Sequence, residues 1–346
     1  MIKVGIIGAT GYAGNEVVRL LLGHPEAEIK WLYSKSYEGN RFSDIYRNYF
    51  EILDGDCVGG DPGKYFDGVD TVFTATPQGY LSNLIKREDL EKTRFIDLSA
   101  DYRIKDVSVY EEWYKLKHGS PELLSEAVYG LCEINREKIR DTRLVANPGC
   151  YTTCSILTAW PLIAEGIIDP NTLVINALSG VSGAGRGAKV ANLFCEVNES
   201  AHAYGVTTHR HTPEIEEQLS ICSGSSVTVT FTPHLIPMNR GILVTETADL
   251  VKGADEDSIR AAYEKHFGNE YFIRLLKDGE TPDTRFTEGS NFVDIGFKVD
   301  KRNNRAIMMG ALDNLIKGAA GQAVQNMNIM FGFDEAEGLR AVPMVP

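Results

Sequence analysis

The sequence predicts a two-domain α/β protein with a doubly wound parallel sheet in its first half and a large mixed sheet in its second. Three observations support this prediction. Short apolar runs alternate with helical spacing in the first half, as parallel βαβ units require. Long runs of alternating apolar and polar residues dominate the second half. A length of 346 residues is enough for two separate cores.

The first half reads as strand, glycine turn and helix, followed by further strands. "IKVGIIG" at residues 2–8 predicts a buried strand, and "GYAGNEVVRLLLGHP" predicts the helix after it, which ends at Gly23 and Pro25. Further strands are predicted within residues 27–36, 69–77, 94–102 and 143–149. Since helical patterns separate these strands, we expect them to be parallel.

The second half predicts an α+β domain whose mixed sheet has one covered face. Strands are predicted within residues 172–180, 226–237, 241–251, 291–300 and 305–312, and a helix within 257–268. A last helical pattern begins at Asp313, and we expect it to return to the first domain. The boundary between the domains is expected near Gly149 and Cys150.

Composition and charge exclude several classes of function. The hydrophobic share of 43% and the charged share of 24% are typical of a globular protein. No run is long enough to span a bilayer and the first residues already form a strand pattern, so we expect a cytoplasmic protein without membrane contact. A formal charge of −13 disfavours a nucleic-acid partner. The six cysteines form no metal-binding spacing, so reduced thiols and no metal site are expected.

"GATGYAG" places Gly8, Gly11 and Gly14 between the first strand and the first helix. The spacing differs by one residue from the usual G-x-G-x-x-G pattern. Its context between strand and helix nevertheless suits the approach of a pyrophosphate to a helix N-terminus, as in a Rossmann-type sheet. A tight turn without any ligand is the alternative.

The end of the second predicted strand favours NADP over NAD. An NAD site would be expected to offer an acid there, but this chain has Ser34, Lys35 and Ser36, with Arg41 nearby. Glu38 comes only later in the loop. Hydroxyl groups and cations suit the 2′-phosphate of NADP, although an ordinary solvated loop explains each residue taken singly.

Cys150 follows Asn147-Pro148-Gly149 at the point where a strand pattern ends and a helix pattern begins. The N–H groups and the dipole of a helix N-terminus stabilise a thiolate, so this position predicts a nucleophile. A small buried residue filling the junction is the alternative.

Two histidines suit a partner for that nucleophile. "THRHTPEIEEQL" places His209 and His211 two residues apart, before a predicted helix with Thr212 as its N-cap and Pro213 at its first position. A neutral imidazole beside a helix N-terminus is a suitable general base for a thiol. We expect His211 to act as acid or base and His209 to assist, with the two roles open to exchange.

Three further segments are candidates for anion binding. "SGVSGAGRGAK" at residues 179–189 carries Ser182 and Arg186 in a glycine-rich loop, which is either a substrate loop or a flexible surface loop. "SADYR" adds Ser99 and Arg103 at the end of a first-domain strand. Arg240 in "PHLIPMNRGI" is either a further contact or a solvent-facing strand residue.

The chain as a whole resembles the N-acetyl-gamma-glutamyl-phosphate reductases, which are relatives of aspartate-semialdehyde dehydrogenase. The resemblance rests on "GATGYAG", "DLSADYR", "NPGCYTT", "SGVSGAGR", "HRHTPEI", "PHLIPMNRGI" and "DNLIKGAAGQAVQNMN", which follow one another in the family's order. It covers nearly the whole chain. One departure is Gln78 in "TPQGY", where many members of the family have histidine.

The resemblance implies an NADP(H)-binding domain at residues 1–149, a catalytic and dimerisation domain at 150–312, and a return of 313–346 to the first domain. It implies a homodimer or homotetramer that reduces a small acyl phosphate through a thioester on Cys150, in arginine biosynthesis. Together with the residue patterns it implies cofactor contacts from Gly8, Thr10, Gly11, Tyr12, Ala13, Gly14, Ser34, Lys35, Ser36, Thr76, Pro77, Gly183, Asn314, Gly318 and Ala319. Substrate contacts are implied for Ser99, Arg103, Asn147, Ser182 and Arg186.

Four other functions remain open at this stage. A branch of the family reduces an aminoadipyl phosphate held on a carrier protein in lysine biosynthesis, and aspartate-semialdehyde dehydrogenases share the chemistry. A hydride-only NADP enzyme would leave Cys150 inert. A regulator that senses NADP would keep the dinucleotide fold without catalysis.

Overall fold

The chain folds into two compact units, each with its own sheet. The computed structural model describes residues 1–345. The first unit contains Met1–Pro148 and Ala319–Arg340, and the second contains Gly149–Gly318 and the residues from Ala341 onward. The return to the first unit therefore covers 319–340, whereas residues 313–318, expected to return as well, group with the second unit.

The first unit is built on a parallel sheet. Within the described residues this sheet has six strands in the order β2-β1-β3-β4-β6-β5, and every pair of neighbours is parallel. The chain passes from β1 to β2 on one side and then crosses to β3 on the other side of β1. The strands are β1 Ile2–Ile7, β2 Ala27–Tyr33, β3 Thr71–Thr74, β4 Arg94–Asp97, β5 Val128–Tyr129 and β6 Leu144–Ala146.

Helices and loops cover both faces of this sheet. On one face, helix α10 contacts both α1 and α5, and each of the three helices contacts strands of the sheet. The other face packs against residues of η2, α3 and the segment between β3 and α3. The helices are α1 Tyr12–Leu22, α2 Phe42–Ile45, α3 Arg87–Lys92, α4 Val107–Tyr114, α5 Cys132–Asp141 and α10 Gly321–Phe331, with the 3₁₀ helix η2 at Pro62–Gly68.

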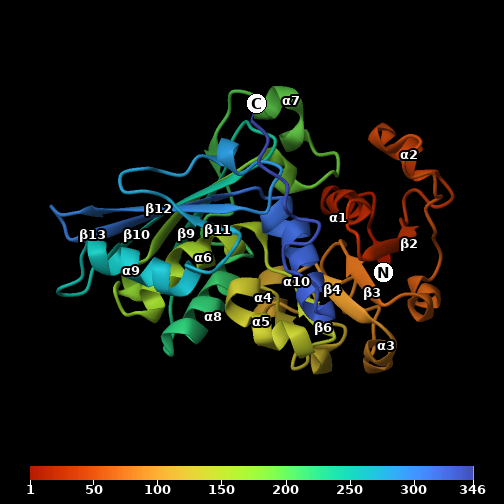
Figure 1. Ribbon diagram of the computed structural model, residues 1–346, viewed down its shortest axis with the longest axis horizontal. Coiled ribbons are helices and arrows are strands. Elements are labelled where there is room, and N and C mark those ends of the chain that lie inside the picture. Colours follow the sequence, from red (N-terminus) through yellow and green to blue (C-terminus); the bar gives the residue numbers. More distant parts are fainter. Residues whose placement is uncertain (346) are drawn as a thin grey trace. The chain divides into compact units, whose positions relative to one another are not determined.

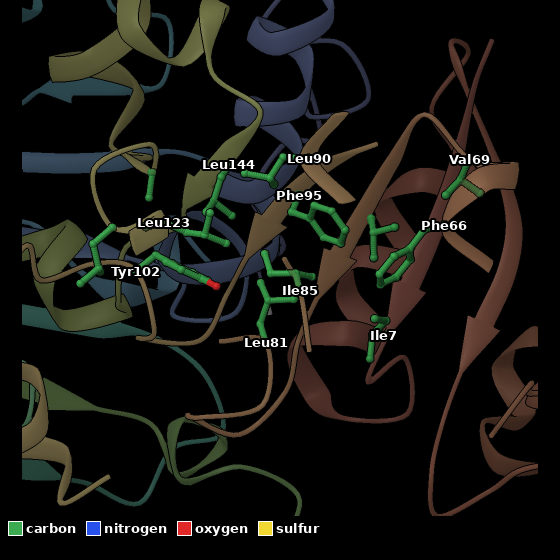
Figure 2. Close-up of a cluster of buried hydrophobic side chains, with 14 of the residues drawn as sticks. Ile7, Phe66, Val69, Leu81, Ile85, Leu90, Phe95, Tyr102, Leu123 and Leu144 are labelled. Atoms are coloured by element: carbon green, nitrogen blue, oxygen red, sulfur yellow. The ribbon is translucent and has the colours of Figure 1, made fainter. Parts of the chain in front are cut away.

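An apolar cluster fills the second of these faces (Figure 2). Ile7, Phe95 and Leu144 reach it from three different strands, and each is fully buried. The Phe66 and Phe95 rings meet edge to face with centroids 5.0 Å apart, a favoured arrangement for aromatic pairs. The cluster fixes the spacing of the strands whose carboxyl ends carry the predicted cofactor residues.

The second unit is built on a mixed sheet. In the part of the chain that the structure describes, this sheet has seven strands in the order β11-β12-β13-β10-β7-β9-β8. The pairs β11–β12 and β7–β9 are parallel and the others are antiparallel. The strands are β7 Val174–Ser179, β8 His202–Ala203, β9 Thr230–Leu235, β10 Ile242–Asp249, β11 Ile273–Leu275, β12 Val293–Asp300 and β13 Arg305–Leu312.

One face of the mixed sheet is covered by helices (Figure 1). Helix α6 packs on β10 and β13, and α8 and α9 flank it. Burial alternates along β10, with Ile242 and Val244 facing α6 and Leu243 only half-buried on the opposite face. The helices are α6 Cys150–Ala164, α7 Phe194–Val197, α8 Thr212–Ser223 and α9 Glu256–Phe267.

The predicted fold class is confirmed. The strands that the sequence did not predict are short. β5, β8 and β11 have two or three residues each, too few for a periodic pattern to predict. Among residues 1–345, no helix has both the length and the apolar character that a membrane crossing requires.

Truncation of Phe95 tests the core of the first unit. Phe95→Ala removes a fully buried ring and its contact with Phe66, so we expect the free energy of unfolding to fall by about 3–5 kcal/mol. Phe95→Leu keeps most of the volume and should lose less. Urea unfolding followed by tryptophan fluorescence measures both, and equal losses in the two variants would contradict this packing.

Candidate functional site

The glycine turn after β1 is packed too tightly for side chains at Gly8 and Gly14. Gly8 has φ +80°, and a Cβ added there would lie 2.3 Å from the Ala75 carbonyl oxygen. A Cβ on Gly14 would lie 2.2 Å from the Gly8 carbonyl oxygen. Gly11 is the N-cap of α1, and no side chain caps this helix start. The turn therefore brings backbone N–H groups to an open helix N-terminus, as a bound pyrophosphate requires.

The ends of β2 and β3 lie next to this turn. The buried Thr10 and Ser34 hydroxyls share a hydrogen bond of 2.8 Å, whereas Lys35 and Ser36 are exposed. The methyl group of Thr76 lies near Gly8, and its buried hydroxyl has no partner within the protein. Lys35 and Ser36 are therefore accessible to a 2′-phosphate, while Ser34 supports the turn through Thr10.

Ser99, Arg103 and Asn147 meet at the carboxyl ends of β4 and β6. Arg103 donates from Nε to the Asn147 carbonyl and from Nη2 to the Leu98 carbonyl, both at 2.7 Å. The Ser99 hydroxyl donates to Asp97 at 2.6 Å, and burial with the nearby Asp101 charge raises the pKa of Asp97 to about 7. The three residues predicted to bind substrate thus make protein hydrogen bonds that hold the strand ends together.

Asn147, directly after β6, also holds the segment that returns to the first unit. Its Nδ2 donates to the carbonyl oxygen of Ala319 at 3.1 Å, and its Oδ1 accepts from Asn326 of α10 at 3.0 Å. Asn147 is fully buried. It therefore fixes the returning segment against the end of β6, three residues before Cys150.

Cys150 is the first residue of α6 in the second unit. Gly149 is the N-cap, and the thiol is partly exposed, unlike that of Cys154 one turn later. Burial raises the pKa of Cys154 well above its usual value. Because the unbonded N–H groups of a helix start favour a thiolate, Cys150 is the reactive candidate of the two.

A buried carboxylate joins the start of α6 to the start of α8. Glu214 Oε1 accepts from the Gly149 N–H at 3.0 Å and from the Thr152 hydroxyl at 2.8 Å. Glu214 is 1% exposed and lies three residues after His211. The contact fixes the helix that carries the thiol relative to the helix that carries the histidine.

His209 lies in an aromatic enclosure. Its ring contacts Tyr151, Tyr204 and Phe231, with centroids 5.4–5.7 Å away. Burial, with a smaller effect of the Arg210 charge, lowers the pKa of His209 from 6.5 to about 4. The His211 N–H donates to His209 Nδ1 at 3.1 Å, so neutral His209 carries its proton on Nε2.

His211 is the N-cap of α8, and its ring lies 4.9 Å from that of His209 and 6.0 Å from that of Tyr151. The predicted N-cap was Thr212, which instead occupies the first helical position, with Pro213 at the second. The prediction was wrong by one residue because His211 already has helical backbone angles. His211 therefore lies closer to the helix N-terminus than expected.

The glycine-rich loop after β7 is fixed at its start. The N–H groups of Gly180, Val181 and Ser182 donate to the 238–241 turn at 2.9–3.2 Å. Gly183 and Gly185 are exposed, and Arg186 is half-buried beyond them. The alternative of a flexible surface loop is thus wrong for residues 180–182.

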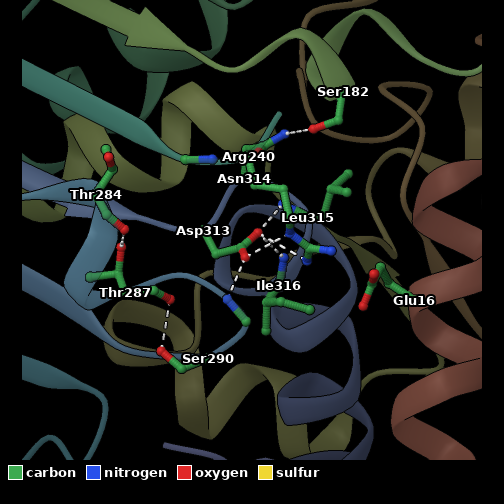
Figure 3. Close-up of polar contacts among 12 residues, drawn as sticks. Glu16, Ser182, Arg240, Thr284, Thr287, Ser290, Asp313, Asn314, Leu315 and Ile316 are labelled. Atoms are coloured by element: carbon green, nitrogen blue, oxygen red, sulfur yellow. Dashed lines mark hydrogen bonds and ion pairs between the residues drawn. The ribbon is translucent and has the colours of Figure 1, made fainter. Parts of the chain in front are cut away.

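Gly318 lies against Cys150. A Cβ added at Gly318 would be 2.8 Å from Cys150 Cβ and 3.1 Å from Cys150 Cα. Asn314 donates from Nδ2 to the Ser182 hydroxyl at 2.9 Å. The segment after β13 therefore packs against Cys150 through Gly318. It also contacts the glycine-rich loop through Asn314 and Ser182, as Figure 3 shows.

Tyr151, Tyr204 and Glu214 are neighbours of the candidate site that the sequence did not reveal, and Arg240 has a partner that the sequence did not reveal. The Tyr204 hydroxyl donates to Tyr151 at 3.2 Å, and Tyr151 donates to the His234 carbonyl at 3.1 Å. Glu214 had only its place in the first turn of a helix as a signal. Arg240 is not a solvent-facing strand residue: it pairs with the buried Asp313. No motif spacing predicts such partners.

Two family models together cover most of the chain. Residues 3–142 match the semialdehyde dehydrogenase NAD binding domain, and residues 150–314 match the semialdehyde dehydrogenase dimerisation domain. An N-acetyl-gamma-glutamyl-phosphate reductase of Lachnospira eligens is 63% identical over 348 residues, which cover 100% of both chains. The chain belongs to this reductase family. It is therefore an oxidoreductase.

Two further relatives have the same reductase name. The N-acetyl-gamma-glutamyl-phosphate reductase of Lachnoclostridium phytofermentans is 59% identical over 100% of both chains, and one from Campylobacter jejuni is 55% identical over 98% of each. Aspartate semialdehyde dehydrogenase II of Vibrio cholerae has a TM-score of 0.71 at 18% identity, covering 96% of this chain and 98% of its own. At that identity the likeness shows the shared fold.

No group of three or more His, Cys, Asp or Glu residues suited to a metal ion occurs within residues 1–345. None of the six cysteines forms a disulfide within the described residues.

Alanine variants of the glycine turn separate folding from cofactor binding. At Gly11 an added Cβ meets only the Gly8 carbonyl oxygen at 3.5 Å, whereas at Gly14 it collides with backbone. We expect Gly11→Ala to leave the melting temperature within about 2 °C of the wild type but to weaken NADPH binding at least about tenfold, because the methyl group enters the space of the pyrophosphate.

Gly14→Ala is the comparison variant, and it should lower the melting temperature as well. Fluorescence titration with NADPH and thermal unfolding measure the two effects. Unchanged NADPH affinity in Gly11→Ala would exclude this turn as the phosphate site.

The buried His209 should make the stability of the protein depend on pH. The pKa of His209 is lower in the folded chain than in the unfolded chain. Its contribution to the free energy of unfolding is therefore complete above pH 6.5 and is lost as the pH falls toward 4. Between about pH 8 and pH 5 we expect the wild type to lose roughly 2 kcal/mol more than His209→Gln does. Urea unfolding at the two pH values measures this difference, and parallel losses in both proteins would contradict a buried neutral imidazole.

Proposed function

We propose that this chain reduces N-acetyl-L-glutamyl 5-phosphate to N-acetyl-L-glutamate 5-semialdehyde with NADPH and releases phosphate, as a step of arginine biosynthesis. The observation that carries the proposal is the partly exposed Cys150 thiol at the first position of α6, in the same unit as His209 and His211. The reaction is the one named by relatives that match the full length of the chain.

The first chemical step is attack by the Cys150 thiolate on the acyl carbon. A C–S bond forms, the C–O bond to the phosphate breaks, and phosphate leaves with the electron pair. The N–H groups in the first turn of α6 suit the oxygen that gains charge at the acyl carbon. The thioester on Cys150 is a better hydride acceptor than a carboxylate, which gives the covalent step its purpose.

The NADPH-binding residues proposed are those of the turn at Gly8–Gly14, with Lys35 and Ser36 for the 2′-phosphate and Thr76 and Pro77 nearby. The start of α1, which no side chain caps, and the unpartnered Thr76 hydroxyl fit such a ligand. When bound, NADPH supplies the hydride that converts the thioester carbon to the aldehyde. The Cys150 sulfur then leaves as thiolate, ready for another turnover.

His211 is proposed as the proton acceptor and donor, and His209 as the residue that positions it. His209 stays neutral over the physiological range because burial lowers its pKa to about 4. Its Nδ1 is already used to accept the His211 N–H. This leaves His211 as the imidazole better suited to take the thiol proton and to return a proton.

Ser182 and Arg186 are proposed to bind the anionic groups of the substrate. Both belong to the loop that begins after β7, in the unit that contains the thiol. Arg103, Ser99 and Asn147 are better explained as the frame behind the site, since their polar groups hold the ends of β4 and β6.

The proposed oligomer is a homodimer formed through the second unit. On the sheet face opposite α6, half-buried apolar side chains of three strands lie next to one another, among them Leu178, Leu243 and Met309. Such a surface favours burial against a second copy. We also propose a cytoplasmic location, where six thiols remain reduced.

Two related substrates compete with this proposal: a carrier-bound aminoadipyl phosphate and aspartyl phosphate. Phosphate-dependent reduction of NADP can be assayed side by side with N-acetylglutamate semialdehyde, aspartate semialdehyde and aminoadipate semialdehyde. We expect the first to be oxidised with a kcat/KM at least about a hundredfold above the others. A preference for either competitor would reassign the substrate.

A non-enzymatic regulator is tested by the reactivity of the thiols. Burial raises the pKa of Cys222 to about 11 and also raises that of Cys57, so both should alkylate slowly near neutral pH. We expect iodoacetamide to modify Cys150 first, as followed by peptide mass spectrometry. Equal rates at the three cysteines would support a regulator with an inert Cys150.

Cys150→Ser tests the covalent step. The hydroxyl is a far weaker nucleophile than a thiolate, so we expect kcat to fall at least about a thousandfold while NADPH binding is retained. Cys222→Ser, distant in sequence and on helix α8, is the control and should keep full activity. Substantial turnover by Cys150→Ser would remove the thioester from the mechanism.

A further inference from the structure

A buried ion pair lies beside the segment that reaches the thiol and has no part in the steps above. Arg240 donates two hydrogen bonds to Asp313, from Nε to Oδ2 at 2.9 Å and from Nη2 to Oδ1 at 3.2 Å (Figure 3). The Asp313 side chain is fully buried and that of Arg240 is 18% exposed. Arg240 lies two residues before β10, and Asp313 immediately follows β13.

The same carboxylate holds three backbone N–H groups. Gly289 donates to Asp313 Oδ2 at 2.7 Å, and Leu315 and Ile316 donate to Oδ1 at 2.8 and 3.2 Å. The Asp313 carbonyl oxygen accepts from the Gly318 N–H at 3.0 Å. Asp313 therefore fixes the path of the chain from the end of β13 to Gly318.

The segment from Asp313 to Gly318 makes two contacts with residues of the candidate site. Gly318 lies against Cys150, so close that a Cβ would be 2.8 Å from Cys150 Cβ. Asn314 accepts from the Gly241 N–H at 2.8 Å and donates to the Ser182 hydroxyl at 2.9 Å. A shift of the segment by a few tenths of an ångström would move the loop residue Ser182 and the surroundings of the thiol together.

We propose that Arg240 and Asp313 are positioning residues for the reaction, which set where Ser182 and Gly318 lie around the Cys150 thiol. The inference rests on the proposed function of this site. A buried carboxylate that receives five hydrogen bonds needs the guanidinium charge beside it. Without Arg240, the carboxylate must gain a proton or move toward water, and either change releases the backbone groups that it holds.

A second ion pair of the same unit provides a matched control. Arg274 of β11 donates from Nε to Asp294 of β12 at 2.5 Å, and the Asp294 side chain is 4% exposed. Arg274 also donates to the Phe286 carbonyl and stacks on the Phe292 ring. These partners are not site residues, so loss of this pair removes an ion pair with a buried carboxylate without removing a contact of the segment at 313–318.

The experiment compares Arg240→Gln, Arg240→Lys and Arg274→Gln with the wild type. Three quantities are measured: the melting temperature, kcat and KM with N-acetylglutamate semialdehyde, NADP and phosphate, and the rate of Cys150 alkylation by iodoacetamide. We expect Arg240→Gln to lose at least about tenfold in kcat and to change the alkylation rate at least about threefold. Arg274→Gln should lower the melting temperature similarly yet keep kcat and the alkylation rate within about twofold.

Arg240→Lys separates charge from geometry. Lysine keeps the charge but cannot make the two-pronged contact, so its kcat should lie between those of Arg240→Gln and the wild type. If Arg240→Gln does not fold, the comparison of Arg240→Lys with Arg274→Lys decides the question in the same way.

The proposal is overturned if the Arg240 variants lose no more kcat, and change Cys150 alkylation no more, than the Arg274 variants at equal loss of melting temperature. Failure of the proposed function has a different signature. In that case the wild type shows no phosphate-dependent NADP reduction with any semialdehyde, while the alkylation rates still report whether the ion pair positions the thiol.

Discussion

The close packing of Gly318 against Cys150 is the constraint on which the candidate site depends. The chain leaves the first unit between Pro148 and Gly149 and returns to it between Gly318 and Ala319, so both passages lie next to the nucleophile. In the first unit, Asn147 holds the Ala319 carbonyl; in the second, Gly318 touches Cys150. No side chain fits between them, which makes glycine the residue that this position requires.

Around this contact, buried charged side chains hold the helices and the segment that carry the candidate site residues. Glu214 joins the starts of α6 and α8, and Asp313 with Arg240 holds the segment that ends at Gly318. Two imidazoles two residues apart are placed in different surroundings, and the aromatic enclosure keeps His209 neutral. Desolvation of the His209 ring disfavours its charged form, which supports the proposal that His211 handles the proton.

The fold could be predicted from the sequence wherever a pattern was long enough to repeat. Strand, glycine turn and helix at residues 2–22 and the alternating runs of β10, β12 and β13 appear where the patterns place them. The two-residue strands β5 and β8 could not be predicted, because they exist only through their pairing with β6 and β9. The N-cap of α8 was missed by one residue since backbone angles, and not residue type, decide it.

For the site, the sequence by itself determined the chemistry: a cysteine at a helix start, two neighbouring histidines and a glycine turn after the first strand are local features with local causes. Only the tertiary structure decided which polar residues face a ligand and which support the frame. Ser99, Arg103 and Ser34, which the sequence offers as ligand contacts, hold strand ends and turns through buried hydrogen bonds. Arg240, which the sequence offers as either a further contact or a solvent-facing residue, pairs with a carboxylate 73 residues away. The physical reason is that burial and partners come from non-local packing, which residue type and spacing do not encode.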